Sequence, residues 1–444
     1  MSRLDWVNAL PQRWEAKPLR AVADYVVSNV DKAPADGEVH VRLCNYTDVY
    51  NNEFITLDLN FMEATATQAE IARFGLTVND VIITKDSESW DDIAVPALVR
   101  ETAPDLVCGY HLALLRPRKQ HIHGAFLLRC LQAKPVRVQL ELAANGVTRF
   151  GIPKSDIGST RLPVPPLNVQ RAIADYLDRE TARIDALIAA KERLLALLAE
   201  KRRALITRAV TRGLDPNAPM KDSGIPWLGE IPAHWTATRI KHVVTLRRSR
   251  VQSDEERKPY IGLEHIESWT GRLVSDLSSA DEAAVSATRE SDSLSSTFEP
   301  GDVLFGKLRP YLAKAWVAEF AGRCTTEALV MQPVAVEARF LRYVFLCPDF
   351  IDLVDASTFG SKMPRADWDF IGNIKIPLPP ATEQRAIVEH ITEETARLDA
   401  LRAATERSIA LLKERRAALI SAAVTGQIDV PACAASTADR EAVP

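Results

Sequence analysis

Two stretches of the chain show the apolar periodicity of a long α-helix. In residues 168–211 the predicted apolar seam consists of Leu177, Ile184, Leu187, Leu194, Leu198 and Leu205, with the alternating spacing of a coiled coil. Pro163, Pro165 and Pro166 precede this stretch, so we expect Asn168 to cap the helix and Gly213 to end it. A helix of about 44 residues is roughly 65 Å long. Its single apolar stripe requires a partner.

Residues 382–425 are predicted to supply that partner. They align with the first stretch at a constant offset, and more than half of the aligned positions are identical without a gap. Shared periodicity alone would not give shared residues, so this is an internal repeat. The second seam is Ile391, Leu398, Leu401, Leu412 and Leu419. Because the second helix must return toward the start of the first, we expect an antiparallel coiled coil.

The remainder of the chain divides into two globular segments. The expected order is a globule over 1–166, a helix over 167–212, a linker over 213–224, a second globule over 225–380, a helix over 381–426 and a disordered tail over 427–444. Strand-like runs at 39–43, 54–59, 78–83 and 110–115 and a helical run at 126–131 predict an α+β class with two α/β globules.

The two globules repeat a sparse set of anchor residues. Trp14 aligns with Trp235, Asp80 with Asp302, Cys108 with Cys324 and Phe126 with Phe340, and Pro153 and Asp156 align with Pro364 and Asp367. Elsewhere the two segments differ almost completely. One scaffold with two different recognition surfaces explains this pattern.

Composition excludes several classes of protein. The chain has 444 residues, 47% hydrophobic and 26% charged, with no apolar run long enough to span a bilayer and no secretory signal. Six scattered cysteines indicate reduced thiols and a cytoplasmic location, and the histidines, with only the weak pair His121 and His123, predict no metal site. With a net charge of −4, any nucleic-acid surface must be a local basic patch.

One segment resembles a catalytic motif. Residues 301–308 fit most of the phosphate-loop pattern, but Leu308 stands where Ser or Thr should hold Mg²⁺, and the interior is apolar. We therefore predict a buried strand that ends in a basic residue. The chain also lacks a dinucleotide fingerprint, a nucleophile elbow, a paired-cysteine zinc motif and the tetrapeptide of amino-methyltransferases. We expect no cofactor and no catalysis by this chain alone.

Basic residues cluster within the globules and are candidates for DNA contact. They are Lys85, Arg116, Arg118, Lys119, Arg149 and Lys154 in the first globule, and Lys307, Arg309, Lys362 and Arg365, with Ser361, in the second. A solvated charged face is the alternative for each. The charges at 201–203 and 413–416 on the helices are interpreted as solvated flanks or protein contacts.

The arrangement resembles the DNA-specificity subunit of type I restriction-modification systems. The resemblance rests on Pro-rich steps at 162–167 and 376–380, the QRAI helix starts at Gln170 and Gln384, and the opening at 224–235, and it covers nearly the whole chain to Gly426. It implies that each globule reads one half of a bipartite DNA target. It also implies that the helices dock two copies of an adenine methyltransferase, which brings S-adenosylmethionine, and that a restriction and translocation subunit can join.

Two other hypotheses compete with this interpretation. A bivalent protein-binding scaffold would share the coiled coil and the repeats, but it would give no sequence-specific DNA footprint. A phosphate-loop enzyme would require Lys307 to bind nucleotide, which a binding assay tests directly.

Overall fold

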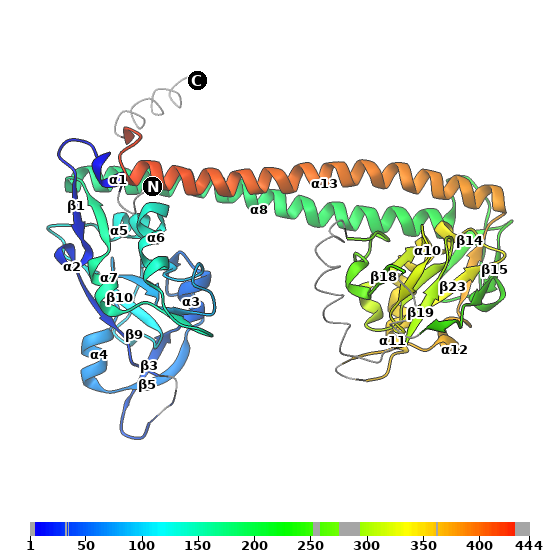
Figure 1. The fold of residues 1–444 in the computed structure, drawn as a ribbon, viewed down its shortest axis with the longest axis horizontal. Helices are drawn as coiled ribbons and strands as arrows, with labels where there is room; N and C mark the ends of the chain where they lie inside the picture. The colour runs from blue at the N-terminus through cyan, green and yellow to red at the C-terminus, as the bar shows by residue number, and fades with distance from the viewer. Residues whose placement is uncertain are drawn as a thin grey trace. The chain divides into compact units, whose positions relative to one another are not determined.

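A computed structural model describes residues 5–31, 33, 35–251, 258–274, 294–360 and 363–430. The chain forms two compact units, unit 1 being Met1–Lys191 with Arg407–Pro444 and unit 2 being Glu192–Glu406 (Figure 1). Each unit therefore holds one globule and a segment of each long helix. The predicted tail beyond residue 430, with Cys433, lies outside the described residues.

The main sheet of unit 1 is covered on both faces. Its five strands lie in the order β2 (Ala23–Val27), β10 (Leu112–Pro117), β6 (Val81–Thr84), β8 (Pro96–Val99) and β4 (Phe54–Ile55). In β6, Val81 and Ile83 pack toward α5 (Gly124–Gln132) and α8 (Leu167–Arg212), whereas Ile82 packs toward a second sheet. Since successive strand residues face opposite sides, burial of both faces explains the continuous apolar run of β6.

Smaller elements complete unit 1. The second sheet has the order β5 (Met62–Ala66), β3 (Val39–Cys44) and β9 (Leu106–Cys108). Two antiparallel pairs join β1 (Glu15–Pro18) to β12 (Arg161–Val164) and β7 (Asp86–Ser87) to β11 (Phe150–Gly151). The remaining helices of the globule are α1 (Asp5–Asn8), α2 (Leu19–Val22), α3 (Tyr46–Asn51), α4 (Gln68–Phe74), α6 (Lys134–Ala143) and α7 (Lys154–Ser159). A capping box between Thr67 and Glu70 fixes the start of α4.

Unit 2 repeats this plan. Its main sheet has the order β16 (Val244–Leu246), β23 (Ala328–Pro333), β20 (Val303–Gly306) and β21 (Ala315–Val317). A second sheet has the order β17 (Arg250–Val251), β19 (Ser295–Phe298), β22 (Gly322–Cys324) and β18 (Tyr260–Ile261). Two strand pairs join β13 (Met220–Asp222) to β14 (Glu230–Pro232) and β15 (Thr236–Arg239) to β24 (Lys375–Leu378). The helices are α10 (Ala338–Phe345), α11 (Pro348–Ala356) and α12 (Trp368–Ile371), with 3₁₀ turns η1 (Ile240–His242), η2 (Leu263–His265) and η4 (Pro310–Leu312).

Several predicted elements need correction. The predicted strand at 78–83 begins only at Val81, because Thr77 to Asp80 form a turn closed by the bond from the Asp80 N–H to the Thr77 carbonyl (3.0 Å). The run at 54–59 is a strand only at Phe54–Ile55. The predicted linker contains β13. The phosphate-loop-like segment is confirmed as a buried strand, β20.

Two sets of aligned anchor residues can be compared directly in the structure. Asp80 and Asp302 directly precede β6 and β20, and both are buried. The alignment of Pro153 with Pro364 is wrong by three residues. Pro153 precedes α7 as Asp367 precedes α12, which is the 214-residue offset that also relates Gln170 to Gln384.

The long helices end close to their predicted limits. They are α8 (Leu167–Arg212) and α13 (Ala381–Val424). Gly213 and Gly426 follow them in the left-handed region, with φ of +71° and +72°. The prediction that Asn168 caps α8 is wrong, because the helix begins at Leu167.

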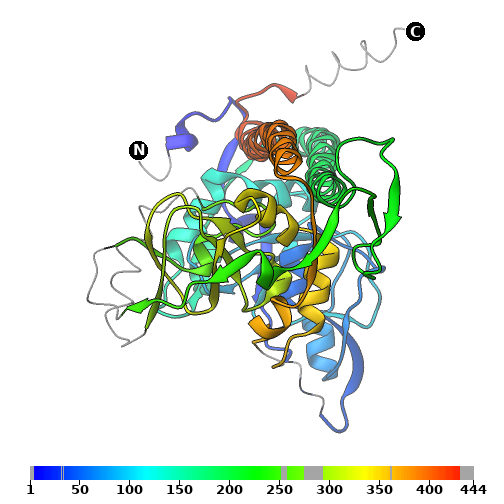
Figure 2. The same cartoon turned by 90° about the vertical axis from the view of Figure 1, so that its right-hand side faces the viewer.

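Within each unit the two helix segments run in opposite directions. In unit 1, Ile173 and Leu177 share a core with Ile420 and Val424, and in unit 2, Ile206 and Val210 share one with Ile387 and Ile391. Figure 2 shows the green and orange helices side by side.

Three of the eleven predicted seam residues are exposed. Leu177, Ile184, Leu198 and Ile391 are buried, and Leu205, Leu398, Leu412 and Leu419 are half-buried. Leu187, Leu194 and Leu401 are 52%, 37% and 47% exposed, which contradicts their assignment to the seam. Ile188, the neighbour of Leu187, is buried instead. Spacing alone does not distinguish between neighbouring apolar residues such as Leu187 and Ile188. Polar residues also occupy part of the buried helix face, so apolar spacing does not trace that face completely.

Candidate nucleic-acid interface

In unit 1 the main sheet ends at a lysine in a polar network. Lys85 follows β6; its N–H donates to the His111 carbonyl (2.9 Å), and its carbonyl accepts from the Ile152 N–H (3.0 Å). Asp86 pairs with the Lys85 ammonium (2.8 Å) and with His111 Nδ1 (2.7 Å). Burial opposes ionisation of Asp86, but Lys85 and His111 outweigh burial and lower its pKa. Asp86 is therefore an ionised acceptor at the sheet edge.

Unit 2 has the same backbone arrangement with different side chains. Lys307 follows β20; its N–H donates to the Glu327 carbonyl (3.0 Å), and its carbonyl accepts from the Ala366 N–H (2.9 Å). Glu327 takes the place of the histidine, and its carboxylate pairs with Arg365 through both oxygens (3.0 and 3.1 Å). The two lysines predicted from sequence are thus equivalent positions on one frame.

Beside the network of unit 1 lies a cavity of about 730 Å³. Tyr46 and Tyr50 stack in its wall with ring centroids 5.6 Å apart, and the Tyr50 hydroxyl donates to Asp92 (2.6 Å). Burial raises the pKa of Tyr46, so its hydroxyl stays protonated. Arg149, a predicted candidate, is exposed at the rim. Aromatic faces, donors and acceptors are all available here to a base edge.

Arg116 has an internal partner. Its guanidinium binds both oxygens of buried Asp80 (3.0 and 2.8 Å). In unit 2 the equivalent Asp302 is bound by Arg247 (2.7 and 3.2 Å). Arg247 follows β16, whereas Arg116 lies in β10. The buried aspartate is repeated, while its arginine partner is not.

The remaining candidates of unit 1 lie on its surface. Arg118 pairs with Asp24 (2.6 Å) and is 42% exposed. Lys154 lies over the Tyr25 ring at 5.7 Å. Lys119 is exposed.

Around Lys307, exposed apolar side chains accompany the charges. Arg309 is exposed and has a left-handed φ of +50°. Tyr311 and Phe359 are 45% and 64% exposed. Ser361 and Lys362 lie outside the described residues.

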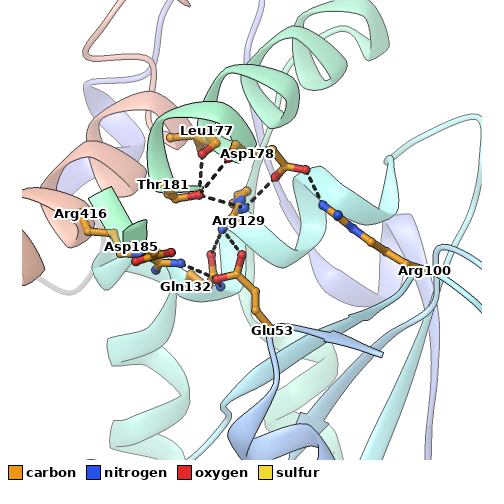
Figure 3. Close-up of polar contacts among 9 residues, drawn as sticks. All are labelled: Glu53, Arg100, Arg129, Gln132, Leu177, Asp178, Thr181, Asp185 and Arg416. Atoms are coloured by element: carbon orange, nitrogen blue, oxygen red, sulfur yellow. Dashed lines mark hydrogen bonds and ion pairs between the residues drawn. The ribbon is translucent and has the colours of Figure 1, made fainter. Parts of the chain in front are cut away.

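Buried ion pairs, which the sequence did not reveal, join the globule of unit 1 to its helices (Figure 3). Arg129 of α5 is fully buried; it binds Glu53 (2.8 Å) and Asp178 of α8 (2.6 Å). Arg416 of α13 also binds Glu53 (2.5 Å) and reaches Asp185 of α8 (3.0 Å). Burial opposes ionisation of Glu53, but Arg129 and Arg416 together lower its pKa.

Unit 2 has the counterpart of the pair between helices. Arg202 binds Asp399 (2.9 Å), and these residues stand 214 positions from Arg416 and Asp185. The Arg202 side chain is 10% exposed. Arg202 and Arg416 are therefore not solvated flanks. Their recurrence in both repeats was the available signal, because solvated charges need not recur at matched positions.

The QRAI motif has a structural role at both helix starts. Gln170 is buried; its amide donates to the carbonyls of His121 and Pro165 (both 2.9 Å) and accepts from the His123 N–H (2.9 Å). Gln384 likewise donates to the Pro step before its helix and accepts from the N–H of the residue that precedes α10 (both 2.8 Å). This glutamine fastens each long helix to its globule.

Comparisons with known proteins agree with this architecture. Residues 47–196 match the family model described as a type I restriction modification DNA specificity domain. The chain is 25% identical over 303 residues to the EcoDI type I restriction enzyme specificity subunit of Escherichia coli, covering 64% of this chain and 66% of that protein. Over these residues the chain is similar to type I restriction-modification specificity subunits.

Two solved structures share the fold. A chain from a study of complex assembly in a type I system aligns with a TM-score of 0.66 at 18% identity, covering 94% of this chain and 99% of that one. The HsdS subunit of Thermoanaerobacter tengcongensis aligns with a TM-score of 0.51 at 17% identity, covering 94% and 98%. Within the described residues, no helix has the length and apolarity needed to cross a membrane.

Proposed function

We propose that this specificity subunit recognises a bipartite, asymmetric sequence in double-stranded DNA, with one half-site read by each globule. The observation that carries the proposal is the repeated frame at the sheet edges. Lys85 and Lys307 have the same two backbone bonds, yet Asp86 and His111 surround one, and Glu327 and Arg365 surround the other. A constant frame with changed hydrogen-bonding groups is what two different base sequences require.

The basic candidates divide into two expected roles. Lys119, Arg149 and Arg309 are exposed and suited to phosphate contact. Arg116 and Arg365 are held by carboxylates, and we assign to them positioning of the neighbouring loops.

The long helices are proposed to form an antiparallel coiled coil that docks two copies of an adenine methyltransferase. Exposed leucines recur at the 214-residue offset, since Leu187 and Leu401 are 52% and 47% exposed and Leu197 and Leu411 are 61% and 65% exposed. Identical apolar positions left exposed twice suit two identical partners. The methyltransferase brings S-adenosylmethionine and flips the target adenines. A restriction and translocation subunit joins the same complex, and the site of action is the cytoplasm.

The test is the methylated sequence in cells that carry this chain and its methyltransferase. Replacing residues 1–160 with the matching segment of a relative is expected to change one half-site only. A change in both half-sites, with the fold retained, would contradict one globule for each half.

Single variants test the roles of the lysines and arginines. Lys307→Ala or Arg309→Ala is expected to weaken DNA binding for all sequences and to reduce the salt slope by about one if the residue contacts phosphate. Loss of about 1–3 kcal/mol at one position would mark base reading. Lys201→Ala, on an exposed helix face, is the control. No sequence-specific footprint with normal methyltransferase docking would favour the protein-binding scaffold.

A further inference from the structure

A second charged cavity lies inside unit 2, away from the sheet-edge lysines. Its volume is about 820 Å³, and it forms where α10 and residues 270–272 meet the segments of α8 and α13 that belong to this unit. Four arginines from these different elements line it: Arg202, Arg272, Arg339 and Arg342.

Three of these arginines are held around one carboxylate and one aromatic ring. Arg202 binds Asp399 (2.9 Å), and Arg272 binds the same carboxylate. Arg342 donates to the Gly271 carbonyl (3.3 Å) and lies over the Tyr343 ring at 4.4 Å. Among the described residues, the buried Nε groups of Arg202 and Arg342 have no hydrogen-bond acceptor. These two Nε atoms are themselves buried, so the cavity is lined by other atoms of the arginine side chains.

The acidic residues that line the cavity leave this positive charge unbalanced. Asp399 is already shared by two arginines. Glu337 caps α10 by accepting from the Phe340 N–H (2.6 Å). Glu319 is exposed. Burial lowers the pKa of the Arg202 and Arg272 guanidinium groups, and for Arg272 the proximity of Arg202 lowers it further.

In unit 1, two carboxylates neutralise the arginine at the equivalent position. There Arg416, the counterpart of Arg202, binds two carboxylates, Asp185 from α8 and Glu53 from the globule. In unit 2, Arg202 pairs with Asp399 and donates to the Thr270 carbonyl (3.5 Å). The globule carboxylate that acts on Arg202 is Glu267, which is itself paired with Arg402 (3.1 Å).

We propose that this cavity is an oxyanion site that holds a phosphate group from solution, either inorganic phosphate or a small phosphate ester. Arg272 and Arg342 present charged groups from the globule, and Arg339 is exposed. Thr392 of α13 also lines the cavity, with its hydroxyl bonded to the Tyr343 hydroxyl (3.2 Å). Charge-assisted bonds from several arginines are the usual means of phosphate recognition. A bound phosphate would hold residues 270–272 and α10 against the helix segments of unit 2.

The test uses the full chain without DNA or partners, so its outcome is independent of the proposed DNA recognition. Inorganic phosphate, and in a parallel series glycerol phosphate, is titrated at constant ionic strength against chloride. Calorimetry is expected to show saturable binding. Hydrogen exchange is expected to show increased protection at residues 270–272.

Variants identify the site. Arg339→Gln, an exposed position that should fold normally, and Arg272→Gln are each expected to weaken phosphate binding by about 10-fold or more. Arg397→Gln is the matched control, because Arg397 is an exposed arginine of α13 that is absent from the cavity lining and pairs with Glu393 and Glu394. Absence of binding would overturn the proposal. An increase in hydrogen-exchange protection that does not saturate with phosphate and is equal in all variants would also overturn the proposal, because general exclusion of the salt from the protein surface would explain it.

Discussion

At Arg129, one side chain joins three parts of unit 1. Its guanidinium lies in an otherwise apolar helix, where an unpaired charge would be costly to bury. Glu53 and Asp178 compensate it from the globule and from α8. The apolar face of α5 supplies most of the packing energy, and the ion pairs fix which part of α8 lies against it.

Arg129→Met is expected to destabilise unit 1 by about 3–5 kcal/mol, because it leaves Glu53 and Asp178 without their buried partner. Native-state hydrogen exchange at the β6 amides measures the change. The exposed pair of Arg397 provides the control, and Arg397→Gln should cost less than about 1 kcal/mol. Equal costs for the two variants would show that the buried network does not orient the helix.

The lowered pKa of Glu53 predicts that the contact between the globule and the long helices of unit 1 weakens at acidic pH. Its pKa in the folded state lies below the usual 4.5, so the stabilisation it provides is complete above that value and is lost as pH falls through the lower folded pKa. Glu53→Gln should therefore lower stability at neutral pH and flatten the loss of stability below about pH 4.5. Urea unfolding across pH measures this, with Glu15→Gln, an exposed carboxylate, as control. If the free energy of unfolding of Glu53→Gln fell with acid as steeply as that of the unchanged protein, Glu53 would not be the group responsible.

At the scale of elements, each long helix is joined to its globule by the same buried glutamine. Gln170 satisfies backbone groups on either side of the helix start, so its loss leaves buried donors and acceptors without partners. The Pro-rich step and the glutamine together set the direction in which α8 leaves the globule.

Gln170→Ala is expected to cost about 1–3 kcal/mol and to expose the start of α5 to hydrogen exchange. Gln384→Ala should cost somewhat less, because Gln384 makes fewer of these bonds. Gln332→Ala, at an exposed strand position, is the control. Normal protection at α5 in Gln170→Ala would contradict a fastening role.

The exposed leucines give a prediction about partners. Leu197→Ser combined with Leu411→Ser should leave thermal stability unchanged, because both side chains are largely exposed, and should abolish methyltransferase binding. Each single variant should lose one of two bound copies, measured by the mass of the complex. Leu198→Ser, at a buried position, should instead lower stability. Retention of both copies in the double variant would place docking elsewhere.

At the scale of the whole molecule, two copies of one plan are connected by two long helices. Inserting four helix-forming residues after Ala199 adds about 6 Å to α8. At 3.4 Å for each base pair, the DNA spacer should lengthen by about one pair and at most about two, since α13 is unchanged. A four-residue stutter is tolerated in a coiled coil.

The half-site sequences should stay the same in this variant, because no globule residue changes. Mapping of methylated adenines gives the spacer directly. An active complex with the original spacer would mean that the helices dock partners without setting the distance.

The sequence by itself determined the periodic and repeated features. Long helices with apolar stripes, their glycine ends and most of the aligned anchors follow from local propensity and from direct comparison of residues, and the helix limits agree with the structure to within two residues. The buried strand at β20 was likewise predictable from its apolar run.

Only the tertiary structure decided which side chains meet. Leu187 and Leu194 fit the predicted seam, but the choice between neighbouring leucines depends on the opposing helix. In the sequence alone, three arginines have the character of surface charges. The structure pairs Arg116 with Asp80, Arg202 with Asp399 and Arg416 with Glu53. The physical reason is that burial and charge pairing are properties of distant segments brought together, and periodicity along the chain contains no information about those partners.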